Sequence, residues 1–240
     1  MYYFISVLAA LEVIYMSAIH PRFLASIISG NKTISFIGCF VQLFTAGTCG
    51  ITESYLLAVM AIDRDLAINW PLRYSAIMTM TFCIGLAVIP WIVGISFMLT
   101  ESILTAHLDF CGCNEIDHFF CDLSPLQVLV CSDNFIVNVV ISLLGVFACG
   151  VPFCIIIQAY IRIIITITKI KSSVGKRKAF STCSSHLIVT SLFYISICAV
   201  YINPNGNASK KYISLMFALI SPTLNPFIYA LRNKDVKEAL

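Results

Sequence analysis

Two glutamates inside long apolar stretches are the candidate chemical groups that this chain makes most conspicuous. Glu12 lies in the stretch that begins at residue 2, and Glu53 interrupts the stretch that begins at residue 36. A buried carboxylate is costly unless it is protonated, paired or bound to a cation. Two interpretations are open from the residues alone. Either a protonated acid hydrogen-bonds to a neighbouring helix, or the two acids face inward around a cation.

Catalytic chemistry finds little support in the remaining residues. The chain contains no H-E-x-x-H, G-x-S-x-G or glycine-rich phosphate loop. His186 follows the run Ser181-Thr182-Cys183-Ser184-Ser185, which an intramembrane protease could use, but no partnered nucleophile and base stand out. The sequence therefore predicts a protein that is not an enzyme.

The composition indicates the environment in which the chain folds. Of 240 residues, 59% are hydrophobic and 11% are charged, whereas soluble chains contain about 45–50% apolar and about 25% charged residues. This excess of apolar residues predicts a membrane protein. The net charge of +3 is too small to argue for a nucleic-acid partner.

Six apolar stretches are long enough to cross a bilayer, which takes about 20 helical residues. The expected spans are 2–28, 36–64, 74–100, 134–168, 178–203 and 212–231. Because the alternating pattern of a β-barrel is missing, we expect an all-α transmembrane helix bundle that forms a single domain over residues 1–240. A transporter remains open from composition, although no internal repeat pairs the two halves.

The positions of lysine and arginine predict the orientation of the bundle. Most of them lie in the segments 63–73, 162–178 and 232–237. The positive-inside rule places these segments in the cytoplasm, and six spans then put both termini there. The opposite loops hold only Arg22, Lys32, Lys210 and Lys211.

The outer loop between the third and fourth spans is acidic and rich in cysteine. It contains Cys111, Cys113, Cys121 and Cys131, while Cys39 begins the second span on the same side. An oxidising exterior favours disulfides among these residues. A metal site that adds His107 and His118 is the weaker alternative, because the spacing is unlike that of zinc sites.

Two glycosylation sequons, at Asn31 and Asn207, also fall on outer loops. Each lies close to a span, so we expect each to be silent as often as modified.

Four separated motifs resemble those of vertebrate olfactory receptors, a branch of the rhodopsin-like G-protein-coupled receptors. Residues 60–74 read MAIDRDLAINWPLRY and resemble the family's MAYDRYVAIC-PL-Y. Residues 178–187 read KAFSTCSSHL and match the family almost letter for letter. Residues 222–233 resemble its P-LNP-IY-LRN, and residues 114–122 read NEIDHFFCD, which is typical of its outer loop. The resemblance covers the whole chain and implies the family's helices two to seven, with the amino terminus and first helix absent.

The resemblance also implies roles for individual residues. Cys39 is expected to pair with Cys121, and Cys111 with Cys131, which leaves Cys113 as an odd thiol. Arg64 is expected to switch partners on activation and meet the G protein, with Asp63 restraining it at rest. Asn225, Pro226 and Tyr229 resemble the hinge of the family's seventh helix. Glu12 and Glu53 fall where related receptors hold a sodium ion, and no other cofactor is implied.

Two departures from the family pattern place polar side chains near this switch. Asp65 replaces the family's tyrosine, and Asn69 replaces its cysteine. A second carboxylate next to Arg64 could hold that arginine more tightly or repel an acidic partner, which puts the coupling strength in doubt.

The resemblance places a ligand pocket between the outer halves of four helices. The expected pocket residues are Ala46, Gly47, Gly50 and Ile51 in the second span, Tyr194, Ile197 and Tyr201 in the fifth, and Phe217 and Ala218 in the sixth. Small residues leave room for a ligand, but they equally mark close helix packing. Such a pocket suits a small, volatile, largely apolar molecule.

The function that follows is that of an odorant receptor. The expected partners are a volatile odorant, a heterotrimeric G protein of the stimulatory olfactory type and membrane lipid. The expected location is the plasma membrane, in the cilia of olfactory neurons. The alternatives are a receptor of the same fold used outside the nose and a truncated receptor that does not signal.

Overall fold

The structure is a computed structural model that describes residues 2–111, 114–132, 135–201 and 207–232. Over these residues it is a bundle of long α-helices, and six of them are long and apolar enough to cross a membrane. The long helices are α1 (Tyr2–Ser29), α2 (Phe36–Asn69), α4 (Met80–Ala106), α6 (Phe135–Lys169), α7 (Ser173–Tyr201) and α8 (Asn207–Arg232). Two short helices, α3 (Tyr74–Ile77) and α5 (Leu123–Gln127), lie in the connections. The prediction of an all-α transmembrane bundle is confirmed.

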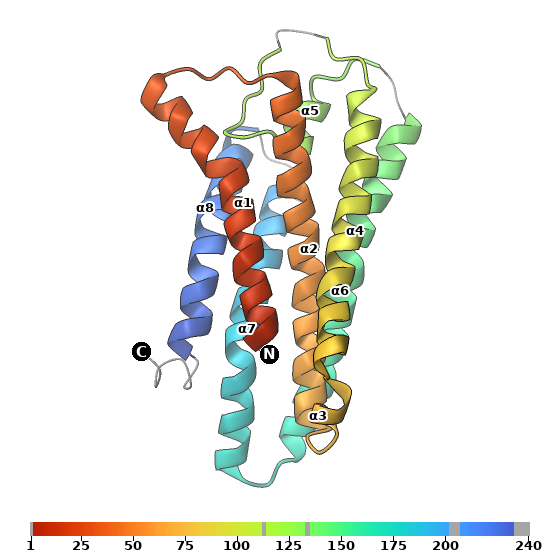
Figure 1. Cartoon of the computed structure of the whole chain (residues 1–240), viewed down its shortest axis with the longest axis vertical. Coiled ribbons are helices and arrows are strands. Elements are labelled where there is room, and N and C mark those ends of the chain that lie inside the picture. The colour runs from red at the N-terminus through yellow and green to blue at the C-terminus, as the bar shows by residue number, and fades with distance from the viewer. Residues whose placement is uncertain (1, 112–113, 133–134, 202–206, 233–240) are drawn as a thin grey trace.

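Helix α2 is the centre of the bundle. It packs against α1, α4, α6 and α7, and Figure 1 shows it running through the middle of the molecule. It is also the most buried of the spanning helices. Leu56, Leu57 and Met60 of α2 lie in the largest hydrophobic cluster, which also takes residues from α1, α4, α6, α7 and α8. Side chains on α2 can therefore contact most of the other helices.

The two ends of the bundle differ in charge. Figure 1 shows α3 and the turn between α6 and α7 at the lower end, and α5 with the long loop at the upper end. The lower end carries the basic segments 63–73 and 162–178. The lower end is therefore the cytoplasmic end by the positive-inside rule.

The third span begins later than the sequence predicted. Residues 74–77 form the separate helix α3, and the spanning helix α4 begins at Met80. The break lies at Thr79, whose extended backbone and side-chain oxygen cap α4 by accepting a hydrogen bond from the Phe82 N–H (3.4 Å). A threonine in this position satisfies one of the free N–H groups that every helix start leaves.

The second span is longer than predicted and ends at Asn69. Its last turn closes where the Trp70 N–H donates to the Leu66 carbonyl oxygen (2.9 Å). At the other end, the Ser35 hydroxyl caps the helix by accepting from the Gly38 N–H (3.1 Å). The extension matters for function because it places Asp65 and Asn69 on one face, four residues apart.

Candidate functional site

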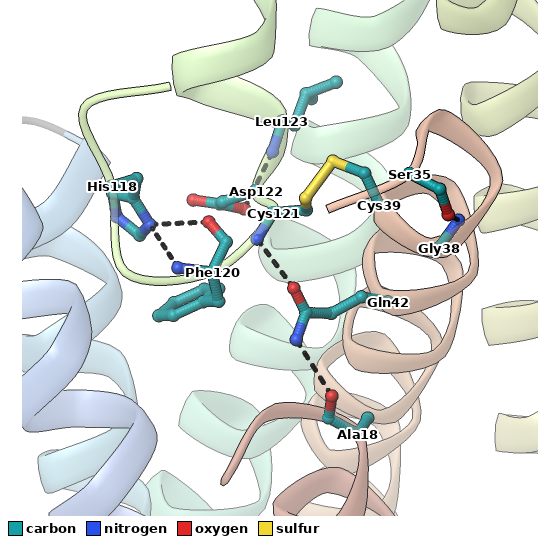
Figure 2. The surroundings of a disulfide bond; sticks show 10 residues. All are labelled: Ala18, Ser35, Gly38, Cys39, Gln42, His118, Phe120, Cys121, Asp122 and Leu123. Atoms are coloured by element: carbon teal, nitrogen blue, oxygen red, sulfur yellow. Dashed lines mark hydrogen bonds between the residues drawn. A yellow bond between two sulfur atoms is a disulfide. The ribbon is translucent and has the colours of Figure 1, made fainter. Parts of the chain in front are cut away.

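The outer loop is fastened to the bundle by a disulfide. Cys39 at the start of α2 is bonded to Cys121, with their Cα atoms 5.4 Å apart. Gln42, one turn further along α2, accepts from the Cys121 N–H (2.9 Å) and donates to the Ala18 carbonyl oxygen of α1 (2.9 Å). Figure 2 shows this chain of contacts. The loop is thus held to α2 by one covalent bond and one hydrogen bond, and Gln42 in turn ties α2 to α1. Gln42 was not anticipated from the sequence.

A second disulfide closes the loop on itself. Cys111 is bonded to Cys131, with Cα atoms 5.8 Å apart, and the two segments form an isolated bridge between Phe110 and Val130. Because Cys111 is in a disulfide, it offers no thiolate to the metal site considered above. Among the described residues no group of three or more His, Cys, Asp or Glu side chains could hold a metal ion. Cys113 lies outside the described residues.

Asp122 lies next to the anchored cysteine, under the loop. Its carboxylate oxygen accepts from the Leu123 N–H (2.9 Å) and so caps α5. Burial raises the pKa of Asp122 above its ordinary value, while the neighbouring His118 and the hydrogen bond from Leu123 lower it. The Nδ1 atom of His118 lies 2.9 Å from the Phe120 carbonyl oxygen and 3.5 Å from the Phe120 nitrogen, and the tautomer of the ring sets which of the two it bonds (Figure 2).

The predicted ligand-binding residues of α2 do not share one face. Gly47 faces α4, because a Cβ atom at Gly47 would lie 2.4 Å from the Cε atom of Met98. Ile51, one turn later, packs with the hydrophobic cluster that contains Met98. These two residues therefore pack toward α4, and their place in a ligand pocket stays a prediction.

Ala46 and Gly50 lie on a different side of α2. Ala46 packs with Ala218 of α8 and Ile19 of α1. At Gly50, a Cβ atom would meet no other atom within 4 Å, so the backbone there borders open space. Ser54, one turn below Gly50, carries the nearest buried hydroxyl on that side of the helix.

Tyr194 joins three helices at a single hydroxyl. Its oxygen lies 3.0 Å from the Ser54 hydroxyl of α2, and it donates to the Cys149 carbonyl oxygen of α6 (3.5 Å). Because the Tyr194 hydroxyl donates its only proton to the Cys149 carbonyl oxygen, the Ser54 hydroxyl is the donor in the bond between Ser54 and Tyr194. The Tyr194 ring also contacts Phe153 of α6, with centroids 4.9 Å apart.

The other predicted pocket residues lie beside this junction. Ile197 and Phe217 are half-buried against the cluster that contains Tyr194, and Phe217 contacts the ring of Phe193 with centroids 5.8 Å apart. Tyr194 and Phe217 are thus linked through the ring of Phe193, and Ile197 lies one turn from Tyr194 on α7. The side chain of Tyr201 lies outside the described residues.

The two buried glutamates meet at an asparagine of α8. Asn225 donates from Nδ2 to Glu12 Oε1 (2.7 Å) and to Glu53 Oε1 (3.4 Å). All three side chains are buried. The Asn225 carbonyl oxygen Oδ1 is buried without a hydrogen-bond partner among the described residues. Three helices thus contribute oxygen atoms to one enclosed polar site.

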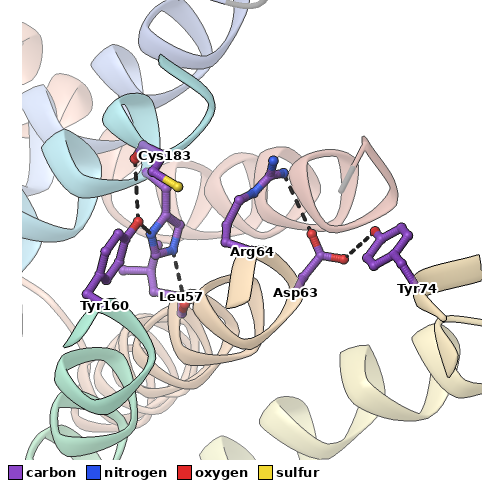
Figure 3. Close-up of polar contacts among 7 residues, drawn as sticks. Leu57, Asp63, Arg64, Tyr74, Tyr160 and Cys183 are labelled. Atoms are coloured by element: carbon purple, nitrogen blue, oxygen red, sulfur yellow. Dashed lines mark hydrogen bonds and ion pairs between the residues drawn. The ribbon is translucent and has the colours of Figure 1, made fainter. Parts of the chain in front are cut away.

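Arg64 is enclosed at the cytoplasmic end. Its Nη2 atom lies 3.7 Å from Asp63 Oδ2, and its side chain is only 5% exposed. Asp63 Oδ1 accepts from the Tyr74 hydroxyl of α3 (2.7 Å), and Figure 3 shows the three side chains in a row. Burial, the bond to Asp63 and the charge of that acid raise the pKa of Tyr74, so the phenol remains a neutral donor. A cytoplasmic protein cannot reach Arg64 unless the surrounding helices move.

Asp65 does not act on Arg64 in the way that the sequence suggested. Its carboxylate turns to α6, where Asp65 Oδ2 lies 3.3 Å from Arg162 Nη1. Its other oxygen accepts from the Asn69 amide (2.6 Å). The reason is geometric: neighbouring residues on a helix point about 100° apart, so Arg64 and Asp65 face different helices.

His186 is a structural tie between three helices. Its Nδ1 atom lies 2.7 Å from the Tyr160 hydroxyl of α6, and its Nε2 atom lies 3.0 Å from the Leu57 carbonyl oxygen of α2. Because Nε2 donates to that carbonyl, Nδ1 accepts the Tyr160 proton, and the Tyr160 hydroxyl oxygen also lies 3.4 Å from the Cys183 carbonyl oxygen (Figure 3). Both ring nitrogens are engaged, so His186 is not the base of a protease dyad. Sequence reasoning missed this role because it depends on which helices face one another.

Of the four remaining predicted site residues, two have side chains that the structure describes. Tyr229 is buried in the largest cluster, and its hydroxyl has no partner among the described residues. Asn31 is exposed on the α1–α2 loop, where its Oδ1 accepts from the Thr33 N–H (2.9 Å). The side chains of Pro226 and Asn207 lie outside the described residues.

Comparison with known proteins decides the family. A family model described as olfactory receptor matches residues 1–240. The chain belongs to the olfactory receptor family. Olfactory receptor 1L1 of Homo sapiens is 43% identical over 242 residues, which cover 100% of this chain and 67% of that relative. Olfactory receptor 6N1 of Homo sapiens is 42% identical over 246 residues, which cover 100% of this chain and 78% of that relative. The resemblance read from the motifs is confirmed.

The fold comparison agrees with this assignment. The crystal structure of squid rhodopsin superposes with a TM-score of 0.76 at 17% identity, covering 98% of this chain and 69% of that one. This likeness establishes the rhodopsin-like helix bundle. The olfactory receptor described here is therefore a multi-pass membrane receptor and not an enzyme, and its family implies odorant ligands and G-protein coupling in general.

Proposed function

We propose that this olfactory receptor binds a small, volatile, largely apolar molecule between α2, α6, α7 and α8. The observation that carries the proposal is the open space beside Gly50, directly above the junction of Ser54 and Tyr194. Apolar side chains around this region favour an apolar ligand, and the Tyr194 hydroxyl supplies one polar anchor. Ile197 and Phe217 contribute the apolar contacts.

Ligand binding is coupled to the cytoplasmic end by a shift of population. An odorant that binds one arrangement of α2, α6 and α7 more tightly favours that arrangement. Arg64 is the group that must become accessible, because it is enclosed and held by Asp63 at rest. The partner is a heterotrimeric G protein of the stimulatory olfactory type, and the signal is a rise in cyclic AMP. The site of action is the ciliary plasma membrane, where lipid contacts the outer helix faces.

A sodium ion fits the enclosed polar site near the middle of the bundle. Glu12 and Glu53 supply carboxylate oxygens, and Asn225 Oδ1 is a buried acceptor without a described partner. Hard oxygen ligands of this kind suit a monovalent cation, which would offset the charge of two buried acids. Bound there, the ion would favour the resting bundle. Without it, one acid must carry a proton, which is the alternative reading of the pair.

A cellular assay tests the proposed function. It uses a hybrid receptor in which the amino-terminal segment and first helix of Olfactory receptor 6N1 precede residues 1–240. Cells that express the hybrid receptor and a cyclic-AMP reporter are exposed to a panel of volatile alcohols, aldehydes, ketones and esters. We expect at least one compound to raise cyclic AMP.

Two matched glycine variants localise the response. Gly50→Val fills the open space and should weaken the response at least about tenfold, because a binding pocket discriminates strongly against lost volume. Gly145→Val adds the same side chain at an open position on α6 and should leave the response unchanged. Equal effects of the two variants would contradict the ligand site. Transport of a labelled solute in place of a cyclic-AMP signal would contradict the receptor function.

A further inference from the structure

Two of the residues that depart from the family motif in α2, Asp65 and Asn69, converge on one contact with α6. Asp65 Oδ2 pairs with Arg162 Nη1 (3.3 Å), and Asp65 Oδ1 accepts from Asn69 Nδ2 (2.6 Å). Asn69 Oδ1 in turn accepts from the Thr166 hydroxyl. Each acceptor oxygen of Asp65 and Asn69 therefore has its own donor.

The spacing of these residues makes the contact a two-step ladder. Asp65 and Asn69 are four residues apart on α2, and Arg162 and Thr166 are four residues apart on α6, so each pair lies on one helix face. The Asp65 side chain is 7% exposed and the Arg162 side chain is 51% exposed. The acid is thus buried against α6, while about half of the arginine side chain is exposed.

This ladder opposes the helix movement that would uncover Arg64. The Tyr160 hydroxyl links α6 to α7 through His186 and the Cys183 carbonyl oxygen. Figure 3 shows Tyr160 and Cys183 on one side of Arg64. If α7 moves away with this link intact, α6 must move with it. The ladder resists that movement because it ties α6 to α2 at the same end.

We propose that Asp65, Asn69, Arg162 and Thr166 form a latch that positions α6 against α2 and keeps Arg64 enclosed. The four residues act through Arg64 and are positioning residues. The consequence for signalling rests on the proposed function, since it assumes that an exposed Arg64 meets a G protein. The enclosure itself does not depend on that assumption. In this receptor the latch lowers signalling in the absence of odorant.

The reactivity of the Cys183 thiol measures directly how far Arg64 is enclosed. Cys183 is buried on α7 beside Arg64. Membranes that contain the hybrid receptor are treated with a water-soluble maleimide without odorant. Mass spectrometry then gives the rate at which the Cys183 peptide is labelled, relative to the same peptide in the denatured receptor.

Charge-removing variants should open the latch. Asp65→Asn keeps an acceptor for Asn69 but loses the charge, and Arg162→Gln loses the opposite charge. Each should raise the labelling rate of Cys183 about threefold, as expected for a partly exposed ion pair. The double variant should label no faster than either single variant, because both remove the same interaction. Arg162→Lys keeps the charge and should stay near the parent rate.

A matched control and two contrary outcomes make the test decisive. Lys169→Gln removes a positive charge from the exposed last turn of the same helix and should leave the labelling rate unchanged. Unchanged labelling in Asp65→Asn and Arg162→Gln would overturn the latch. So would additive effects in the double variant, because they would show that the two residues act separately.

Basal cyclic AMP separates this inference from the proposed function. If the latch and the coupling are both correct, Asp65→Asn raises the labelling of Cys183 and basal cyclic AMP together. If labelling rises while cyclic AMP does not, the latch stands and the proposed stimulatory coupling fails.

Discussion

The hydroxyl groups of Ser54 and Tyr194 lie 3.0 Å apart and join α2 to α7 at the middle of the bundle. The same Tyr194 hydroxyl donates to α6 through the Cys149 carbonyl oxygen. A molecule that binds beside Gly50 and takes a hydrogen bond from either hydroxyl alters the contact between three helices. Ser54 and Tyr194 therefore connect ligand recognition with the arrangement of the bundle.

Replacement of Tyr194 by phenylalanine tests this connection. Tyr194→Phe keeps the ring against Phe153 but removes the hydroxyl, which leaves the buried Ser54 hydroxyl without its partner. We expect a loss of potency of about fivefold for odorants that carry an oxygen acceptor, since one hydrogen bond contributes roughly 1 kcal/mol. Dose–response curves of cyclic AMP in the hybrid receptor measure it.

The neighbouring Tyr55 provides the matched control for that variant. Its hydroxyl donates to the Phe147 carbonyl oxygen on α6 (3.0 Å), whereas Tyr194 donates to a different carbonyl, that of Cys149. Tyr55→Phe removes the same atom from the same helix layer and should leave potency unchanged. Equal potency losses in Tyr55→Phe and Tyr194→Phe would show that a general loosening of the bundle is responsible.

The contact between Tyr74 and Asp63 predicts an effect on basal signalling. Tyr74→Phe removes the hydrogen bond that orients the Asp63 carboxylate toward Arg64. Because bonds to charged groups are among the stronger ones, we expect basal cyclic AMP to rise about fivefold. Tyr212→Phe at the outer end of α8 serves as the control. A basal signal that stays at the parent level at equal surface expression would remove Tyr74 from the switch.

The buried acids predict a response to sodium. If a sodium ion lies between Glu12 and Glu53, raising external sodium at constant ionic strength should lower both basal and odorant-driven cyclic AMP. Glu53→Gln should abolish this dependence, because the amide keeps the shape and removes the charge. Should the sodium response survive in both Glu12→Gln and Glu53→Gln, the cation hypothesis is wrong and the protonated pair is the better account.

Much of the fold could be predicted from the sequence because a bilayer imposes long apolar helices. Glu12 and Glu53 stood out for the same reason, since an acid in an apolar span demands a partner. The structure supplies that partner as Asn225. The break at Thr79 was missed because residues 74–79 do not interrupt the apolar stretch clearly. The start of α4 depends instead on the single cap that the Thr79 side chain provides.

The direction of individual side chains could not be predicted in the same way. Asp65 was expected to act on its sequence neighbour Arg64, but its partner Arg162 is 97 residues away. Gly47 and Ile51 were expected in the pocket, but they face α4. In each case the partner depends on which helix packs against which face of α2. The apolar pattern of a membrane helix does not reveal the neighbouring helix on each face.

The most direct test of the receptor account is nucleotide exchange by a purified G protein. The hybrid receptor in lipid nanodiscs is mixed with the stimulatory olfactory heterotrimer and a labelled, non-hydrolysable GTP analogue. The account predicts that the most potent odorant from the cellular panel accelerates nucleotide uptake in the parent and in Gly145→Val, but not in Gly50→Val. Uptake that remains at the odorant-free rate in the parent receptor, although the odorant binds, would contradict it.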